Sequence, residues 1–400
     1  MALRQSKPVL AVVSPFIDKS HGTERLVAEW ISPLTDDFDV HMYSQRVEDM
    51  DLTKIIWHRI PKFPGPHLFN FIWFLAANHI WRWWDRTFRG IRHDLVFTPG
   101  TNCLDADAIS VHIVFAEFFR QVRPELRFAR NPIRSWPRLI HRLIYYRLVI
   151  ALERHMYTQP RAQLILIARK TAVDLDHFYG RHESLPIVYM GLDHAVFNAP
   201  ARIARREAAR AELGIPDRQI VFLLVGNDWR KKGLFTLLEA LPALADFPVT
   251  LLVAGNDETR PYDAPIERLK LTGRVRFLPV RSDVAFYYAA ADVYVGPSLE
   301  DTFAVPPLEA MACGLPVITT STNGTAEIMT DGVDGLILQD PNDSNTLAAQ
   351  MRALCEDPAL RARLGERAAQ TASRFTWDDN AHEFREIFVR ILREKTKTAA

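Results

Sequence analysis

Short apolar runs alternate along this chain with longer segments whose apolar positions recur at helical spacing. In the first half, Thr23–Ser32 and Arg138–His155 have helical spacing, whereas the short runs are rich in β-branched residues and predict strands. Strands that alternate with helices are typical of a parallel α/β architecture. The strands expected here are Val9–Val13, Asp39–Met42, Leu95–Thr98, Ala108–Ile113, Gln163–Ala168 and Ile187–Tyr189.

The alternation starts again after the loop Phe197–Ala201. In this second half Lys232–Leu244 predicts a helix, and the tail over residues 343–395 has the pattern of helices with charged faces. The strands expected here are Gln219–Val225, Val249–Ala254, Val275–Phe277, Asp292–Val295, Val317–Thr319 and Gly335–Leu338.

We therefore expect an α/β protein with two Rossmann-like parallel-sheet domains facing a cleft. The first domain is expected over residues 1–197 and the second over residues 198–375, with a final helix over residues 376–400 that packs back toward the first domain. Ligands of open parallel sheets bind beyond the carboxyl ends of the strands. The loops that follow the strands are therefore the places to look for functional residues.

The composition fits two folded domains and excludes several classes of protein. The chain has 400 residues, of which 48% are hydrophobic and 24% charged, so it is not a disordered chain. Its net charge of +1 gives no sign of a nucleic-acid partner. The three cysteines, Cys103, Cys313 and Cys355, lack C-x-x-C spacing, which excludes a disulfide framework or zinc ribbon and favours a reducing compartment.

The apolar run Pro8–Val13 follows a basic start, as in a signal peptide, but Pro15 and Asp18 interrupt it and no small-residue cleavage site follows. This run is therefore expected to be a strand. A membrane-spanning helix needs about 18 uninterrupted apolar residues, and the nearest candidate, Leu68–Ile80, is too short. We expect a cytoplasmic protein.

The most informative stretch follows the expected strand Asp292–Val295 and reads PSLEDTFAVPPLEAMACGLP over residues 297–316. Its paired prolines favour the first turn of a helix, and a loop that leads into a helix N-terminus offers N–H groups to anions and hydroxyls. Two carboxylates, Asp301 and Glu309, flank that corner. A carboxylate accepts two hydroxyl hydrogen bonds at once, which suits the vicinal diols of sugars and ribose.

This stretch resembles the E-x(7)-E donor site of the retaining GT-B-fold glycosyltransferases of family four. That family has the pattern P-S-x-x-E-G-F-G-x-P-x-x-E-A-M-A-x-G-x-P-V followed by a turn with G-x-x-E-I, and the resemblance extends from Asp292 to Leu338. It implies that Glu309 binds the ribose hydroxyls of a donor nucleotide. It also implies that the backbone of Thr302–Val305 faces the donor sugar and diphosphate.

The chain departs from the family pattern at two places. The first carboxylate is Asp301 instead of glutamate, and the family's Gly-Phe-Gly is replaced by Thr302, Phe303 and Ala304, which precede Val305. Asp301 keeps the charge but reaches one methylene less far toward the sugar. The neighbouring Glu300 is the alternative for this role, and we favour Asp301.

A second motif, Val225–Gly233, lies between an expected strand and an expected helix. Its successive cations oppose the helix dipole unless an anion binds there; a solvated basic loop is the alternative. The motif resembles the family's G-R-x(4–5)-K-G loop, in which the Arg and Lys neutralise the leaving diphosphate. Lys232 matches the lysine, Asn227 occupies the arginine position, and Arg230 is expected to supply the missing charge.

Two features of the first domain also resemble the family. Ser14–Glu24 is similar to a glycine-rich loop that ends in G-G-x-E, with His21 in place of the first glycine, and Gly22 is expected to let the backbone approach the transferred phosphate–sugar. His112 stands at the end of an expected strand, where the family carries a histidine that lines the reaction centre. Taken without the resemblance, a lone histidine is more often structural.

The resemblance implies retaining transfer of a hexose from a nucleoside diphosphate sugar to a carbohydrate or lipid-linked acceptor in polysaccharide or glycolipid synthesis. In such a front-face reaction the leaving diphosphate helps to deprotonate the acceptor, with Lys232 and Arg230 stabilising its charge. No cofactor and no metal are expected, because Asp105-Ala-Asp107 is the only Asp-x-Asp triplet near a strand end. The alternatives are a nucleotide-sugar epimerase of the same fold and a non-catalytic donor-binding scaffold.

The resemblance is thin over residues 53–92, where tryptophans alternate with arginines and histidines, and a second basic, aromatic block covers Phe118–Arg147. Aromatic residues beside cations suit peripheral attachment to the anionic inner face of a membrane or stacking on sugar rings. An aromatic core with solvated arginines is the equal alternative. The tryptophans of the first block are Trp57, Trp73, Trp81, Trp83 and Trp84.

Overall fold

The computed structural model describes residues 7–18, 22–123, 126–128 and 132–399, and the chain forms two compact units. The first unit comprises Met1–Tyr189 and Trp377–Ala400, and the second comprises Met190–Thr376. The chain thus enters the second unit before the expected boundary at residue 197. One reason is that the Leu192 N–H donates to the Phe375 carbonyl at 3.1 Å, which ties this stretch to the second unit.

The first unit contains a six-stranded parallel sheet in the order β5-β3-β1-β6-β7-β8. Its central strands are buried, which explains why they appear in the sequence as continuous apolar runs. A short parallel pair, β2 (Phe16–Ile17) and β4 (Arg46–Val47), lies beside it. The strands of the sheet are β1 (Val9–Val13), β3 (Asp39–Ser44), β5 (Ile55–Arg59), β6 (Leu95–Pro99), β7 (Ala108–Val111) and β8 (Gln163–Leu166).

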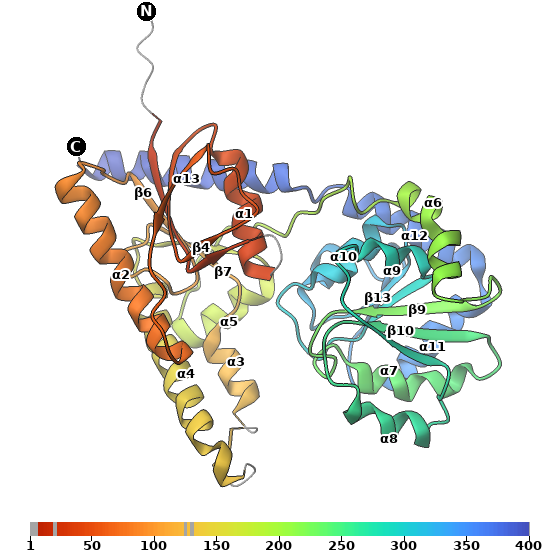
Figure 1. Ribbon diagram of the computed structural model, residues 1–400. Helices are drawn as coiled ribbons and strands as arrows, with labels where there is room; N and C mark the ends of the chain where they lie inside the picture. Colours follow the sequence, from red (N-terminus) through yellow and green to blue (C-terminus); the bar gives the residue numbers. More distant parts are fainter. Residues whose placement is uncertain (1–6, 19–21, 124–125, 129–131, 400) are drawn as a thin grey trace, which may run out of the picture. The chain divides into compact units, whose positions relative to one another are not determined.

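Helices cover both faces of this sheet (Figure 1). On one face the final helix packs against the first, and the Phe384 ring lies 4.4 Å from the Trp30 ring and 5.7 Å from the Phe97 ring. On the other face Phe74, Tyr157 and Leu175 fill the core. The helices of the unit are α1 (Gly22–Leu34), α2 (His67–Phe88), α3 (Phe115–Val122), α4 (Trp136–Tyr157), α5 (Arg169–Tyr179) and α13 (Trp377–Ala399).

One of the strands expected in the first unit is not formed. Ile187–Tyr189 is not a strand but makes a single bridge, Ile187 to Leu166. The Leu166 N–H donates to Pro186 and the Val188 N–H donates back to Leu166, so the segment only crosses the end of β8. The sequence pattern also failed to predict β2, β4, β5, α2, α3 and α5. No helix in the described part of the chain is long and apolar enough to cross a membrane.

The second unit contains another six-stranded parallel sheet, in the order β11-β10-β9-β12-β13-β14. Strand β9 is central and pairs with both β10 and β12. The prediction of two parallel-sheet α/β domains is therefore confirmed. The strands are β9 (Ile220–Val225), β10 (Val249–Ala254), β11 (Val275–Leu278), β12 (Val293–Gly296), β13 (Val317–Thr320) and β14 (Leu336–Leu338).

The helices of the second unit also lie on both faces of its sheet (Figure 1). The helix expected over Lys232–Leu244 begins only at Leu234, because Gly233 has a left-handed φ of 78°, and its last turn is the 3-10 helix η3 (Leu241–Leu244). The helices are α6 (Ala199–Glu212), α7 (Leu234–Ala240), α8 (Arg260–Arg268), α9 (Ala285–Ala290), α10 (Val305–Ala312), α11 (Ser344–Glu356) and α12 (Pro358–Ala372), with the 3-10 helix η4 (Gly324–Ile328).

Candidate functional site

The loop between β12 and α10 is held by the segment that leads into η4. The N-cap residue of α10 is Ala304, whose side chain has no polar atom to cap the helix. Its N–H donates to the Asn323 amide oxygen at 3.1 Å, and its carbonyl accepts from the Thr325 hydroxyl at 2.5 Å. Of the backbone donors expected at Thr302–Val305, that of Ala304 is therefore engaged within the protein.

Phe303 and Ala304 are buried, whereas Thr302 and Val305 on either side are half-buried. A ligand can therefore reach the backbone more easily at the two ends of this four-residue segment than at its middle. Asn323 was not identified from the sequence. The polar turn after β13 in which it lies was the signal that could have found it.

Glu309 lies in α10 and is 5% exposed. The hydroxyl of Tyr288, on α9, donates to Glu309 Oε2 at 2.7 Å. Burial and the nearby carboxylate raise the pKa of Tyr288 well above its usual value, so the phenol remains a donor. Tyr288 therefore orients the carboxylate that the sequence singles out, although the sequence analysis missed this tyrosine.

Lys232 and Asp301 form an ion pair across two loops that are distant in sequence. The Lys232 ammonium donates to Asp301 Oδ2 at 2.5 Å, and the two side chains are 16% and 24% exposed. The Asp301 backbone is fixed by the neighbouring loop, because its N–H donates to Thr322 and its carbonyl accepts from Gly324. The structure thus brings together two of the residues that the motifs identified separately.

A close backbone approach joins these two loops. A Cβ at Gly233 would lie 1.9 Å from the Pro297 carbonyl oxygen, so any side chain there would push the loops apart. The Leu299 N–H also donates to the Lys231 carbonyl at 2.7 Å. Glycine at position 233 is therefore required both by its left-handed backbone and by this contact.

The remaining residues of the Val225–Gly233 loop have different roles. Asn227 accepts the Asn256 N–H at 2.8 Å through its side chain, so it stabilises the loop after β10. Trp229 is buried and its ring stacks on Phe277 at 4.9 Å. Arg230 is exposed in the same turn. The basic residues precede α7 instead of forming its first turn.

His112 lies in the first unit, directly after β7. Its Nε2 is 3.0 Å from the Ser110 hydroxyl, and its ring lies 5.6 Å from the Trp30 ring. Burial lowers the pKa of His112 to about 4, so the imidazole is neutral at pH 7 and has one donor and one acceptor nitrogen. The ring lines a pocket of about 310 Å³ together with Glu24 and Asn102.

Only part of Ser14–Glu24, the segment that resembles the family's glycine-rich loop, lies within the described residues. Ser14 and Glu24 line the same pocket as His112, so the structure brings the two first-domain candidates together. Gly22 is the first residue of α1. His21 lies outside the described residues.

The Asp-x-Asp pair near β7 is engaged by cations of the protein itself. Asp105 Oδ1 accepts from Arg82 at 2.6 Å, and although burial alone would raise the pKa of Asp105, this guanidinium lowers it to about 2. Asp107 accepts from the Val96 N–H at 2.8 Å and from the Lys395 ammonium at 2.9 Å.

Within the described ranges, one group of side chains has its ligand atoms close enough to hold a metal ion: His79, Cys103 and Asp105. Arg82 already contacts all three, because its Nη2 lies 2.9 Å from His79 Nδ1, 3.2 Å from Cys103 Sγ and 2.6 Å from Asp105 Oδ1. The guanidinium thus supplies the positive charge that a metal ion would bring to this group.

Comparisons with known proteins show which family part of this chain resembles. The glycosyl transferases group 1 family matches residues 205–371. The D-inositol 3-phosphate glycosyltransferase of Corynebacterium kroppenstedtii is 32% identical over 230 residues, which are 54% of this chain and 51% of that protein. The lipopolysaccharide glucosyltransferase WaaG of Escherichia coli K12 is 29% identical over 232 residues, 57% of this chain and 62% of that protein.

The match therefore spans about half the length of the first of these curated relatives. A crystal structure of WaaG, described as a glycosyltransferase involved in lipopolysaccharide biosynthesis, aligns with a TM-score of 0.75 over 95% of this chain and 99% of that chain, at 23% identity. At this identity the likeness concerns the fold. Residues 205–371 therefore resemble the glycosyl transferases group 1 family, and the chain has the GT-B fold.

Proposed function

We propose that this protein is a retaining glycosyltransferase that moves a hexose from a nucleoside diphosphate sugar to a carbohydrate or lipid-linked acceptor. The observation that carries the proposal is the pairing of Lys232 with Asp301 beside the loop that leads to Glu309. Two neighbouring loops at the carboxyl ends of adjacent strands, together with the helix α10 that follows one of them, thereby supply a cation for a diphosphate and two carboxylates for sugar hydroxyls.

In this proposal Glu309 accepts hydrogen bonds from the two ribose hydroxyls of the donor, and the Tyr288 hydroxyl keeps its carboxylate in place. The ion pair then changes partner: Lys232 turns to the diphosphate, and Asp301 is released to accept from hydroxyls of the donor sugar. A cation that meets more negative charge in the transition state than in the bound substrate lowers the barrier selectively.

The proposed reaction is front-face substitution at the anomeric carbon. The bond from that carbon to the diphosphate oxygen breaks, the acceptor hydroxyl oxygen attacks from the same face, and its proton passes to the leaving diphosphate. His112, neutral at pH 7, is proposed to hydrogen-bond a substrate hydroxyl without adding charge. This scheme uses no metal ion.

Two other functions remain to be distinguished by experiment. An epimerase of the same fold needs no acceptor, and a scaffold would bind the donor without breaking it. The match of residues 205–371 to the glycosyl transferases group 1 family supports transfer over epimerisation. The engagement of Asn227 by the backbone of Asn256 is the observation that favours a scaffold, because this position lacks the family's arginine.

A donor screen tests the proposed function directly. We expect one UDP-, GDP- or ADP-hexose to raise the melting temperature by several degrees, since a ligand at 100 times its Kd stabilises the folded state by about 2.7 kcal/mol. With that donor, glycosidic product is expected only when acceptor is present, and turnover is expected to persist in EDTA. Formation of epimerised donor in the absence of acceptor would contradict the scheme. So would activity that EDTA abolishes and manganese restores, and that result would point to Asp105 and Asp107 as metal ligands.

We also propose peripheral attachment to an anionic membrane surface through α4 and the 3-10 turn before it. Apolar side chains spaced at helical intervals stand exposed on this segment, which Figure 1 shows as part of a long helix projecting from its sheet. Arginines accompany them, among them Arg138 and Arg142, both exposed. The apolar residues and their exposed fractions are Ile133 75%, Trp136 38%, Ile140 47% and Ile144 50%.

Such a segment is expected to bind anionic vesicles at low salt and to release them near molar salt. Each cation contributes about 1 kcal/mol near the surface, and salt screens it within a Debye length. The double variant Ile140→Ser, Ile144→Ser is expected to bind anionic vesicles at least tenfold more weakly in a sedimentation assay. Burying one isoleucine side chain in an apolar environment contributes about 1.5–3 kcal/mol, and the variant loses two such contributions.

The matched control is Ile203→Ser, because Ile203 is 62% exposed and lies in the second unit. This variant is expected to bind vesicles like the unaltered protein. If the protein does not sediment with anionic vesicles at low salt, the attachment proposal is wrong and a soluble acceptor is favoured.

A further inference from the structure

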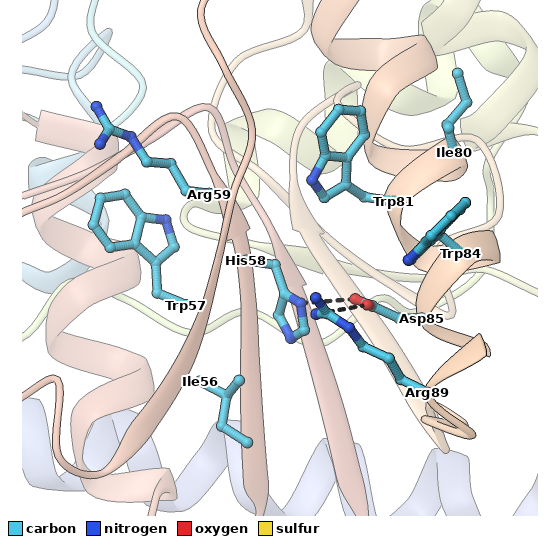
Figure 2. Close-up of a pocket in the computed structure, with 9 residues that line it drawn as sticks. All are labelled: Ile56, Trp57, His58, Arg59, Ile80, Trp81, Trp84, Asp85 and Arg89. Carbon is cyan, nitrogen blue, oxygen red and sulfur yellow. Dashed lines mark hydrogen bonds and ion pairs between the residues drawn. The ribbon is translucent and has the colours of Figure 1, made fainter. Parts of the chain in front are cut away.

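A pocket of about 570 Å³ lies in the first unit between the edge strand β5 and the last turns of α2. Figure 2 shows Trp57 and Arg59 on the strand side, Trp81 and Trp84 on the helix side, and His58 and Asp85 between them. None of the residues that line this pocket belongs to either motif of the donor site. Its volume falls within the range of about 300–1,000 Å³ that is usual for small-molecule sites.

The back of the pocket is a rigid polar wall. Asp85 is 2% exposed and accepts from the Tyr43 hydroxyl at 2.8 Å, while its carboxylate lies 2.7 Å from His58 Nδ1 and 3.1 Å from Arg89 Nη1. His58 in turn lies 2.8 Å from His41. Burial lowers the pKa of His58 to about 4, so this wall presents a neutral imidazole at pH 7.

The rim of the pocket is aromatic. Trp84 is 51% exposed, although an indole of this size normally covers apolar surface. Its ring stays in place because it packs on Phe88 at 4.3 Å, and Trp81 packs edge-on against Trp73 at 6.5 Å. The negative π-face of an indole attracts the weakly positive C–H groups on one face of a sugar ring.

Two guanidiniums give the pocket a positive charge. Arg89 uses Nη1 on Asp85, and its side chain is still 61% exposed. Arg59 is exposed and its guanidinium lies 5.8 Å from the centre of the Trp57 ring, with no ion-pair partner in the described part of the chain. The pocket contains one buried carboxylate and two arginines, so its net charge is positive and complementary to an anion. A guanidinium binds a carboxylate or phosphate through two parallel hydrogen bonds.

This pocket is separate from the pocket that contains His112. The His112 pocket includes Phe71 near the start of α2, whereas this one includes Trp84 near its end. Ile80 is the first residue of this helix that lines the pocket, and at 1.5 Å per residue the nine residues from Phe71 to Ile80 correspond to about 14 Å. One hexose cannot contact both places.

We propose that this pocket, lined by Trp57, Trp81, Trp84, Arg59 and Arg89, binds an anionic sugar, with the ring stacked on the indoles and its phosphate or carboxylate on the arginines. An amphipathic ring fits a pocket with aromatic sides and a polar back better than a flat apolar ring does. The site would hold a charged residue of a saccharide away from the reaction centre.

Isothermal titration calorimetry with glucose 6-phosphate, glucuronate, glucose, inorganic phosphate and UMP tests this proposal on the full chain. We expect either anionic hexose to bind at least tenfold more tightly than glucose or phosphate. Trp84→Ala and Arg59→Ala are each expected to weaken that binding at least tenfold. Both side chains are exposed, so both variants are expected to fold.

Trp83→Ala and Arg86→Ala are matched controls, because these exposed residues lie on the same helix but outside this pocket. They are expected to bind within twofold of the unaltered protein, as is Glu309→Ala. If Glu309→Ala abolishes the binding while Trp84→Ala leaves it unchanged, the sugar occupies the donor site and the proposal is wrong. Tighter binding of UMP than of either anionic hexose, or no binding of either hexose, would also overturn it.

Discussion

Glu309→Ala is expected to weaken binding of the donor nucleotide by about 100-fold or more. A hydrogen bond to a charged group contributes about 1.5–3 kcal/mol, Glu309 is proposed to accept two of them from the ribose, and 1.4 kcal/mol corresponds to a factor of ten. The fold is expected to survive, because the Tyr288 hydroxyl can still donate to the Pro306 carbonyl, 3.3 Å away. Titration with the nucleoside diphosphate of the preferred donor measures the effect.

Further variants test how the carboxylates of this site are oriented and which of them contact the donor. Tyr288→Phe retains the Glu309 carboxylate but removes the hydroxyl that orients it, so it is expected to weaken donor binding by a smaller factor. Glu300→Gln changes a neighbouring carboxylate in the same loop and is expected to have a smaller effect than Asp301→Asn. Unchanged nucleotide affinity in Glu309→Ala would remove Glu309 from the donor site.

Lys232→Ala is expected to lower kcat by about 10²–10³-fold, the usual cost of deleting one group that stabilises charge in a transition state. Its effect on stability is expected to be much smaller, because the ion pair with Asp301 is partly exposed and such pairs contribute little. Steady-state kinetics measured together with thermal unfolding distinguish the two effects. A fall in melting temperature that accounts for the lost activity would contradict a catalytic role.

Lys231→Ala is the matched control, because Lys231 is the adjacent residue and its ammonium lies 3.6 Å from Asp228, away from Asp301. It is expected to leave kcat within a few fold. Arg230→Ala tests whether Arg230 supplies the charge of the family's arginine, whose position is occupied here by Asn227. If Arg230→Ala has no effect while Lys232→Ala does, Lys232 alone neutralises the diphosphate.

The sequence by itself determined the two parallel sheets and most of their strands. Strands such as β1 and β10 are buried on both faces, so each is a continuous apolar run, and such runs are legible without any knowledge of their neighbours. The pattern also located the loop that contains Lys232 and the loop and helix that contain Asp301 and Glu309. It missed β5 because this strand lies at the edge of its sheet, where only Ile55 and His58 of residues 55–59 are buried and no continuous apolar run results.

The tertiary structure alone decided which of these residues meet. Lys232 follows β9 and Asp301 follows β12, and they pair only because β12 lies beside β9 in the sheet, an order that periodicity does not encode. Tyr288 meets Glu309 for a similar reason, through the packing of α9 near α10. The pocket of Trp84 and Arg59 likewise needs β5 and α2 to lie together. Side-chain contacts between distant segments depend on strand order and packing, whereas the strands themselves depend mainly on local burial.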